Sequence, residues 1–187
     1  IDEGGSRVMN VVKIGEQLGT FYGGEYAGVD PANGDALWYI NTKDAEGNVI
    51  DNTSTTNDYA QANFVVLGNP TPPLLGAITN TFTYKGITFS FNFQGVSGNM
   101  IHLAGDSYMA ANDNWWDNQP TDQLNSWKNP GDITMIPEAR LGYENGNQTR
   151  SSRYLSDGSY LKLRTALLSY DFPSRIAKKV GLGGIRI

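Results

Sequence analysis

Apolar and polar residues alternate along residues 87–97, ITFSFNFQGVS, and this is the clearest periodic pattern in the chain. A period of two is typical of a β-strand with one apolar face and one polar face. The stretch LLGAITNTFTY at 74–84 has the same period, and only Lys85 and Gly86 separate the two stretches. Glycine supplies the positive φ that two-residue hairpin turns need. The sequence therefore predicts an antiparallel hairpin over 74–97.

Counting outward from the turn gives the register of this hairpin. Phe82 pairs with Phe89, and the polar residue Asn80 lies opposite Phe91. The apolar face is then formed by Ile78, Phe82, Tyr84, Ile87, Phe89, Phe91 and Phe93. The other face is almost wholly hydroxyl or amide, so the two faces suit different surroundings.

The apolar face needs apolar material to cover it, because burying one Phe or Ile side chain is worth about 1.5–3 kcal/mol. A second sheet would cover it in a soluble β-sandwich, and acyl chains would cover it in a membrane. Three features favour lipid. The strands are long enough for a tilted membrane span, the other face suits a wet lumen, and Tyr84 lies where an interfacial aromatic belt would lie. The seven residues of the apolar face are therefore expected to face lipid, with the sandwich as the alternative.

Shorter strand signals precede the hairpin. Two turn clusters, DPANGD at 30–35 and EGN at 46–48, lie between runs rich in aromatic and β-branched residues. They predict a small meander over 21–51. Residues 51–63 are polar and are expected to form an exposed loop. The proline cluster at 69–73 cannot lie in a central strand and marks the start of the next element.

The alternation stops after the hairpin for about sixty residues. A short helix near 101–111 is expected, followed by a loop whose length is typical of functional or disordered segments. The strand pattern returns over 159–172, where a bulge near Arg164 and Thr165 would bring the leucines on either side into one phase. Residues 173–184 have room for one helical turn, and the final GIRI begins another strand.

Composition narrows the class of protein. The chain has 187 residues, 18% of them charged, and a formal net charge of −5, which argues against a nucleic-acid surface. It has no cysteine, which excludes disulfides and thiolate metal sites. No run of 18 apolar residues occurs, which excludes a transmembrane helix, but the strands of a membrane barrel need only about 9–11 residues each. The N-terminus lacks the features of a signal peptide, so an exported protein would extend beyond this chain.

Several blocks in the chain are specific enough to indicate a family. Two stand out: GNPTPP (68–73) with GAITNTFTYKGITFSFNFQGVSGN (76–99), and SSRYLSDGSYLKLR (151–164) running into LSYDFP (168–173). Three shorter blocks accompany them: GxxLGTFYG (15–23), YAGVD (26–30) and WKNPGD (127–132). Together, and in this order, the blocks resemble the SusC/RagA family, the TonB-dependent outer-membrane transporters of Bacteroidetes. The resemblance spans nearly the whole chain.

The resemblance implies an all-β fold, an antiparallel transmembrane β-barrel fragment with long extracellular loops, from the later part of such a barrel. Residues 1–187 would then be part of one barrel domain. Its sections would be an outer-loop meander and strand (1–73), the β-hairpin (74–97), a long extracellular loop (98–157), and a strand, periplasmic turn and start of the next strand (158–187). A barrel of about 22 strands cannot be closed by a chain of this length, so the fragment alone should not transport anything.

The family resemblance also implies function and partners. It implies TonB-dependent nutrient import across the outer membrane of a Gram-negative cell, usually of oligosaccharides and in some cases of peptides. The implied partners are a SusD-like surface lipoprotein, outer-membrane lipid, and TonB acting through an N-terminal region absent from this chain. Ligand-gated transport involves no covalent chemistry, so we expect no enzyme activity, no cofactor and no nucleic-acid partner. The alternative from the residues alone is a soluble β-sandwich that binds glycans.

Candidate ligand-binding or partner-binding residues lie in the long loop. Trp115 and Trp116 can stack on sugar faces, and Asp113 and Asp117 lie next to them in the sequence. Packing of the loop on itself is the competing role for these tryptophans. Trp127 lies in the family-like WKNPGD block, and a structural role is expected for it.

Two other patterns in the sequence resemble sites of chemistry. Gly105-Asp106-Ser107 is similar to the nucleophile block of GDS-type esterases, but those need a downstream histidine, and the single histidine, His102, lies upstream. The loop acids do not have the spacing of an EF-hand, so they are expected to be solvated charges; they are Asp106, Asp113, Asp117 and Asp122. The sequence therefore predicts no catalytic residue and no metal site.

Overall fold

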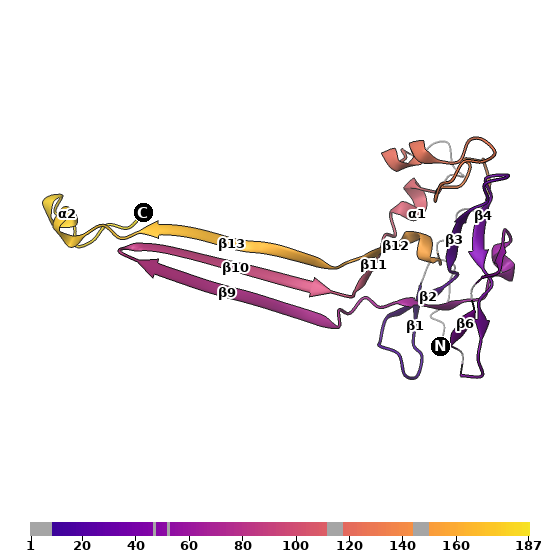
Figure 1. Ribbon diagram of the computed structural model, residues 1–187, viewed down its shortest axis with the longest axis horizontal. Helices are drawn as coiled ribbons and strands as arrows, with labels where there is room; N and C mark the ends of the chain where they lie inside the picture. Colours follow the sequence, from indigo (N-terminus) through magenta and orange to yellow (C-terminus); the bar gives the residue numbers. More distant parts are fainter. Residues whose placement is uncertain (1–8, 47, 52, 112–117, 144–149) are drawn as a thin grey trace. The chain divides into compact units, whose positions relative to one another are not determined.

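The computed structural model divides into two compact units, unit 1 (Ile1–Thr71 and Met100–Asp157) and unit 2 (Pro72–Asn99 and Gly158–Ile187). The residues it describes are 9–46, 48–51, 53–111, 118–143 and 150–187. Within these residues strands predominate and the helices are short (Figure 1). None of the described helices has the length and hydrophobicity of a transmembrane helix. The all-β class predicted from the sequence is confirmed.

Unit 2 contains a three-stranded antiparallel sheet in the order β13-β10-β9, visible as the three long strands of Figure 1. Its strands are β9 (Leu74–Tyr84), β10 (Ile87–Ser97) and β13 (Tyr160–Tyr170), each of 11 residues. The predicted hairpin register is confirmed, with Phe82 opposite Phe89 and Asn80 opposite Phe91. Lys85 and Gly86 form the turn with φ values of 47° and 88°, as a two-residue turn requires.

The bulge predicted in the last long strand is also confirmed. β10 pairs with β13 so that Asn92 lies opposite Thr165 and Phe93 lies opposite Leu163, which leaves Arg164 as the extra residue. A bulge adds one residue to one strand without adding one to its partner. It therefore restores the phase of β13, and the leucines on both sides of the bulge come to lie on the same face as the phenylalanines.

The C-terminal segment of unit 2 folds back along β13. The helix α2 (Ser174–Lys179) occupies the predicted connector. Beyond it, the amides of Tyr170 and Phe172 donate hydrogen bonds to the carbonyls of Ile187 and Ile185, at 2.8 and 2.9 Å. The final residues thus begin a fourth strand along the free edge of β13, as the sequence indicates.

Unit 1 is built from short strands in four small sheets, ordered β1-β2-β8, β3-β4-β7, β5-β6 and β11-β12. The strands are β1 (Asn10–Val11), β2 (Thr20–Gly23), β3 (Tyr26–Val29), β4 (Ala36–Tyr39), β5 (Thr42–Lys43), β6 (Val49–Asp51), β7 (Thr55–Thr56), β8 (Val65–Gly68), β11 (Met100–His102) and β12 (Leu155–Asp157). The helices are η1 (Tyr59–Gln61), α1 (Asp106–Met109), η2 (Thr121–Asn125) and η4 (Ser152–Tyr154).

The predicted meander over 21–51 is correct in its turns but wrong in its pairing. β3 and β4 form a hairpin whose turn is held by two side chains, since Asp30 Oδ1 accepts from the amide of Ala32 and Asn33 Oδ1 from that of Asp35. β5 pairs with β6, as the second turn implies. β2, however, pairs with β1 and β8 rather than with β3. The strands therefore belong to separate small sheets.

The expectation of an exposed loop over 51–63 is wrong in part. β7 pairs with β4, and Ala62 is buried in the core of unit 1. That core consists of Tyr26, Ala36, Trp38 and Ala62, with Tyr59 and Tyr143 packed against it. Trp38 is fully buried, and its ring contacts those of Tyr26 and Tyr59 at centroid distances of 5.1 and 4.9 Å. Two residues of this polar stretch, Tyr59 and Ala62, thus pack into the aromatic core of unit 1.

Candidate functional site

The main candidate surface is the apolar face of the β13-β10-β9 sheet. Of the seven residues expected on it, six are between 36 and 69% exposed: Ile78, Phe82, Tyr84, Ile87, Phe89 and Phe93. Phe91 is half-buried between its neighbours, with ring centroids 5.9 Å from Phe89 and 5.5 Å from Phe93. Across the part of the chain that the structure describes, no second sheet covers these side chains.

The third strand extends this face. Directly paired residues of antiparallel strands point to the same side of a sheet. Leu168 lies opposite Phe89 and Leu163 opposite Phe93, so both leucines share the side of the phenylalanines. The bulge at Arg164 is what allows this, because without an extra residue two leucines an odd number of positions apart would point to opposite sides. The apolar face therefore crosses all three strands.

The opposite face of the β9–β10 hairpin is largely polar and internally hydrogen-bonded. Asn92 Nδ2 donates to Thr79 Oγ1 at 2.6 Å, and the hydroxyls of Thr83 and Thr88 lie 3.3 Å apart. These side chains come from adjacent strands, so the bonds tie the pairs across the sheet. A sheet that is wet on one side and apolar on the other has the two-sided chemistry of a membrane-barrel wall.

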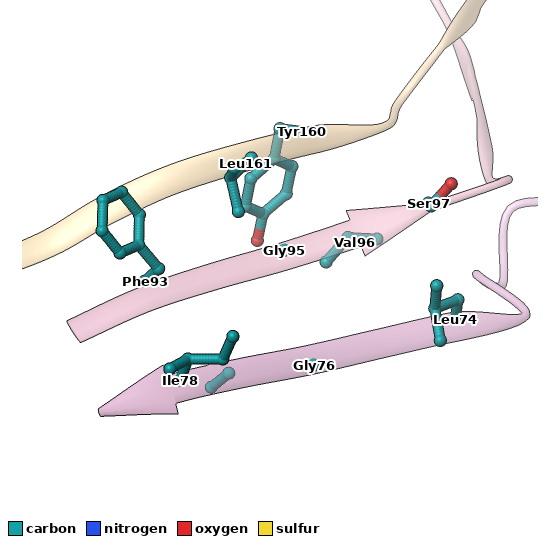
Figure 2. A pocket seen from close by; sticks show the side chains of 10 residues that line it. Leu74, Gly76, Ile78, Phe93, Gly95, Val96, Ser97, Tyr160 and Leu161 are labelled. Carbon is teal, nitrogen blue, oxygen red and sulfur yellow. The ribbon is translucent and has the colours of Figure 1, made fainter. Parts of the chain in front are cut away.

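Two glycines interrupt the apolar face and leave a hollow in it. Gly76 of β9 lies directly opposite Gly95 of β10, and neither has a side chain to fill the surface. The hollow has a volume of about 370 Å³, and its walls are almost wholly apolar. Figure 2 shows Ile78 and Phe93 on one side of the glycine pair and Leu161 beside Gly95.

In unit 1, the part of the long loop (98–157) around Arg140 is bound to the β3–β4 turn. Arg140 is the centre of this contact: its guanidinium donates to the carboxylates of Asp35 and Glu138 and to the carbonyl of Asn33. The guanidinium also lies 5.1 Å from the ring centroid of Tyr143. One side chain thus joins residues about a hundred positions apart, which sequence reasoning did not find.

Trp127 forms the second part of that contact, and its predicted structural role is confirmed. Its ring is buried, and Nε1 donates to the carbonyl of Pro31 at 3.1 Å. Gly34, at φ 78°, lies so close that a Cβ there would be 2.5 Å from the indole ring. The turn and the tryptophan therefore fit each other closely.

The pKa shifts in unit 1 follow from packing. Burial raises the pKa of Tyr59 to about 12 and raises that of Tyr26 as well. Burial also favours a higher pKa for Asp35, but hydrogen bonds from Asn57 and Arg140 outweigh it and hold that pKa below its usual value. These tyrosines stay protonated and Asp35 stays charged at neutral pH. They are structural groups rather than acid–base catalysts.

The candidate loop residues Trp115, Trp116, Asp113 and Asp117 lie outside the described residues. Next to them in sequence, the structure shows a hollow of about 240 Å³ lined in part by Asp106, Asp122 and Arg153. Arg153 Nη2 donates to the carbonyl of Ala110 at 2.9 Å, so the guanidinium is fixed in place. The hollow presents charges of both signs to solvent.

Ser107 and His102, the residues of the esterase-like pattern, have structural contacts. The Ser107 hydroxyl is buried and donates to the carbonyl of Ala104 at 2.8 Å. His102 lies in β11, with its ring centroid 6.3 Å from that of Phe21. Within the described ranges, no group of three His, Cys, Asp or Glu residues could hold a metal ion.

The chain is similar to several characterised proteins. No protein-family model matches it. It is 26% identical over 187 residues to TonB-dependent receptor P3 of Formosa agariphila, covering 97% of this chain and 18% of that protein. It is 30% identical over 154 residues to TonB-dependent receptor P39 of the same organism, covering 80% of this chain and 15% of that protein. The chain thus spans less than a fifth of the length of these relatives.

The chain is also similar to solved structures of a peptide transporter. The chain superposes on the RagAB peptide importer in the closed-closed state with a TM-score of 0.69 and 27% identity, covering 91% of this chain and 19% of that one. A second structure, of the RagAB peptide transporter, gives a TM-score of 0.72 at 24% identity, covering 90% of this chain and 18% of that one. The sequence relatives are TonB-dependent receptors, and the similar solved structures are of a peptide transporter. The resemblance to the SusC/RagA family that the sequence blocks indicate is confirmed by these relatives and structures.

Proposed function

We propose that this chain is part of the barrel wall of an outer-membrane, TonB-dependent nutrient importer. The observation that carries the proposal is the sheet of unit 2, in which three 11-residue strands share one exposed apolar face and the hairpin is largely polar on its other side. Strands of about this length span a bilayer when tilted. In this arrangement, the seven apolar residues of the hairpin face lipid and the Thr-rich side faces the lumen.

The connections between the strands support an orientation. β9 and β10 are joined by two residues, and β10 and β13 by about sixty. Bacterial barrels have short periplasmic turns and longer extracellular loops. The Lys85–Gly86 end of the sheet is therefore assigned to the periplasmic side, and unit 1 contributes to the extracellular loops.

The substrate is a nutrient of the size of an oligosaccharide or a short peptide, and a SusD-like lipoprotein caps the importer. A peptide substrate is the alternative to an oligosaccharide because the similar RagAB structures are of a peptide importer. The loop residues Trp115, Trp116, Asp113 and Asp117 remain the proposed contacts to ligand or lipoprotein. The hollow lined by Asp106, Asp122 and Arg153 adds fixed charges to that region. TonB acts through parts of the parent protein beyond this chain.

The test is a matched pair of arginine substitutions in the full-length parent protein. Phe89→Arg places a charge on the apolar face, where it costs about 2–4 kcal/mol near the bilayer midplane. Thr88→Arg, one residue away, places the same charge on the polar face. Outer-membrane extracts are scored for the heat-resistant electrophoretic mobility of an assembled barrel.

We expect Phe89→Arg to reduce assembly strongly and Thr88→Arg to reduce it little. Equal tolerance of the two, or greater damage from Thr88→Arg, would contradict the assignment of the faces. The soluble β-sandwich would then be the better description.

A further inference from the structure

Positive charge is concentrated in unit 2, in contrast to the acidic chain as a whole. Of the chain's 14 Lys and Arg residues, seven lie in unit 2, together with a single acid, Asp171. The other seven bases and 18 acids belong to unit 1. Five of the seven cations of unit 2 lie in the two connections at the Lys85–Gly86 end of the sheet: Lys85, Arg175, Lys178, Lys179 and Arg186.

Most of this charge is not neutralised within unit 2. Arg186 is paired, with Nε 3.4 Å from Asp171 Oδ1 and a hydrogen bond of 3.3 Å to Ser169 Oγ. The remaining four cations are exposed, and no carboxylate in the described ranges forms an ion pair with them. Lys85 Nζ lies 5.1 Å from the ring centroid of Tyr84. The connections at this end of the sheet therefore carry four exposed cations, one of which lies beside the ring of Tyr84.

An apolar hollow lies next to Lys85. It has a volume of about 590 Å³ and is lined by Lys85, Ile87, Leu168, Ser169, Tyr170 and Ile187. Ile87 pairs with Tyr170, and Leu168 with Phe89, so these three walls belong to the apolar face described above, whereas Ser169, opposite Thr88, comes from the other face. The hollow is thus the end of the apolar face, with a lysine at its edge.

The helix α2 has the same combination of groups. Ile176 lies in α2, Val180 follows as the residue at its C-terminal cap, and both are exposed. Arg175, Lys178 and Lys179 also belong to this helix. Basic and apolar groups side by side on a short helix are typical of segments that lie in a membrane interface.

We propose that this end of the sheet is a binding site for an anionic phospholipid. The phosphate is held by Lys85 and the α2 cations, and an acyl chain lies along the hollow between Ile87 and Tyr170. The charge complementarity selects an anionic headgroup, and the continuity of the hollow with the apolar face selects a lipid rather than a free phosphate. The site rests on the proposed function, which places this face in the membrane and this end at the periplasmic leaflet.

The experiment uses the full-length parent protein, purified and incorporated into lipid nanodiscs of phosphatidylglycerol mixed with phosphatidylcholine. Native mass spectrometry of the released protein measures how much of each lipid stays bound. The test variant is Lys178→Gln with Lys179→Gln, and Lys85→Gln is examined alone because it leaves α2 intact. The matched control is Lys162→Gln with Arg164→Gln, which removes the same charge from β13 away from this end. Heat-resistant mobility of each sample reports barrel assembly independently.

We expect the parent to retain phosphatidylglycerol in preference to phosphatidylcholine. An interfacial Lys or Arg changes affinity for an anionic surface about fivefold, so the double variant should lose roughly 30-fold and Lys85→Gln about fivefold. The control variant should keep the preference. Raising the salt concentration should weaken retention in the parent more than in the double variant.

The outcomes separate this site from the proposed function. An assembled parent without a preference for phosphatidylglycerol would overturn the site alone, and so would equal losses in the double variant and the control. Retention of added lipid A instead of phosphatidylglycerol would place this end at the outer leaflet and overturn the site too. A parent that forms no heat-resistant species would overturn the proposed function together with the site.

Discussion

Deleting Lys162 and deleting Arg164 remove the same charge from the same strand, yet the register of β13 predicts different results. Arg164 is the bulged residue, with Thr165 opposite Asn92 on one side of it and Leu163 opposite Phe93 on the other. Without Arg164 these two pairs become consecutive, and the alternation continues as in a regular strand. The deletion therefore removes the bulge and leaves every other side chain on its present face.

Deleting Lys162 moves a side chain to the wrong face of the sheet whether or not the bulge is kept. If the bulge is kept, Leu161 moves opposite Gln94 and onto the polar face, at a cost of about 1.5–3 kcal/mol in lost apolar burial. If the bulge is lost instead, Arg164 moves opposite Phe93 and onto the apolar face, at about 2–4 kcal/mol. Either route should lower the ratio of folded to unfolded protein by a factor of about ten or more. Deleting Arg164 should change stability by only about 0.5 kcal/mol.

The assay is a urea titration of the full-length parent refolded into lipid vesicles. The fraction of protein with heat-resistant mobility is measured at each urea concentration. We expect a clearly lower midpoint for the Lys162 deletion and a midpoint near that of the parent for the Arg164 deletion. Both variants carry one positive charge fewer, so a general charge effect cancels in the comparison.

Equal midpoints for the two deletions would refute the assigned register. A lower midpoint for the Arg164 deletion would show that the bulge itself is needed, for example to set the twist of the strand, and that the argument from faces is wrong.

Two further predictions concern unit 1 of the same parent protein. Gly34→Ala should destabilise the contact with Trp127, because a Cβ would lie 2.5 Å from the indole ring. Gly131→Ala is the control: Gly131 is also at positive φ but has open space around it, so the substitution should cost only the backbone strain of about 1–2 kcal/mol. The rate of proteolysis of segment 127–143 is measured for both variants, and equal sensitivity would contradict the packing. Because the pKa of Asp35 is depressed, its contact with Arg140 should stabilise the fold fully above about pH 4, the ordinary carboxyl range, and be lost as pH falls through the lower folded-state pKa. Hydrogen exchange of that segment at pH 3 and pH 6 tests this, and an Arg140→Gln variant that shows the same pH dependence as the parent would contradict it.

The parts of the fold that the sequence predicts are those determined by neighbouring residues. The hairpin register follows from the position of Gly86 and the alternation on either side of it. The bulge at Arg164 follows from a change of phase within one strand. In both cases the pattern is strong because a whole strand face must agree with it, and a slip of one residue would turn every side chain over.

The parts that the sequence does not predict depend on contacts between distant residues. The pairing of β4 with β7 and of β2 with β8 involves strands of two to four residues, too short to show a period. Arg140 is one of 14 basic residues, and nothing near it in the sequence marks Asp35 as its partner. The structural role of Trp127 is predicted only because this residue lies in a family-like block.

The pairing of β11 with β12 has a consequence for the order in which the long sheet forms. Closing the two-residue turn between β9 and β10 costs little chain entropy, whereas joining β10 to β13 must close about sixty residues, roughly 3 kcal/mol more. β11 and β12 pair within that segment, at Met100–Asp157 and His102–Leu155, and each is only two residues away from a long strand. Once this small pair has formed, the remaining closure is as local as a hairpin. The three residues on each side then act as the starting point from which β10 and β13 zip together, so weakening them should slow assembly while leaving the finished sheet nearly unchanged.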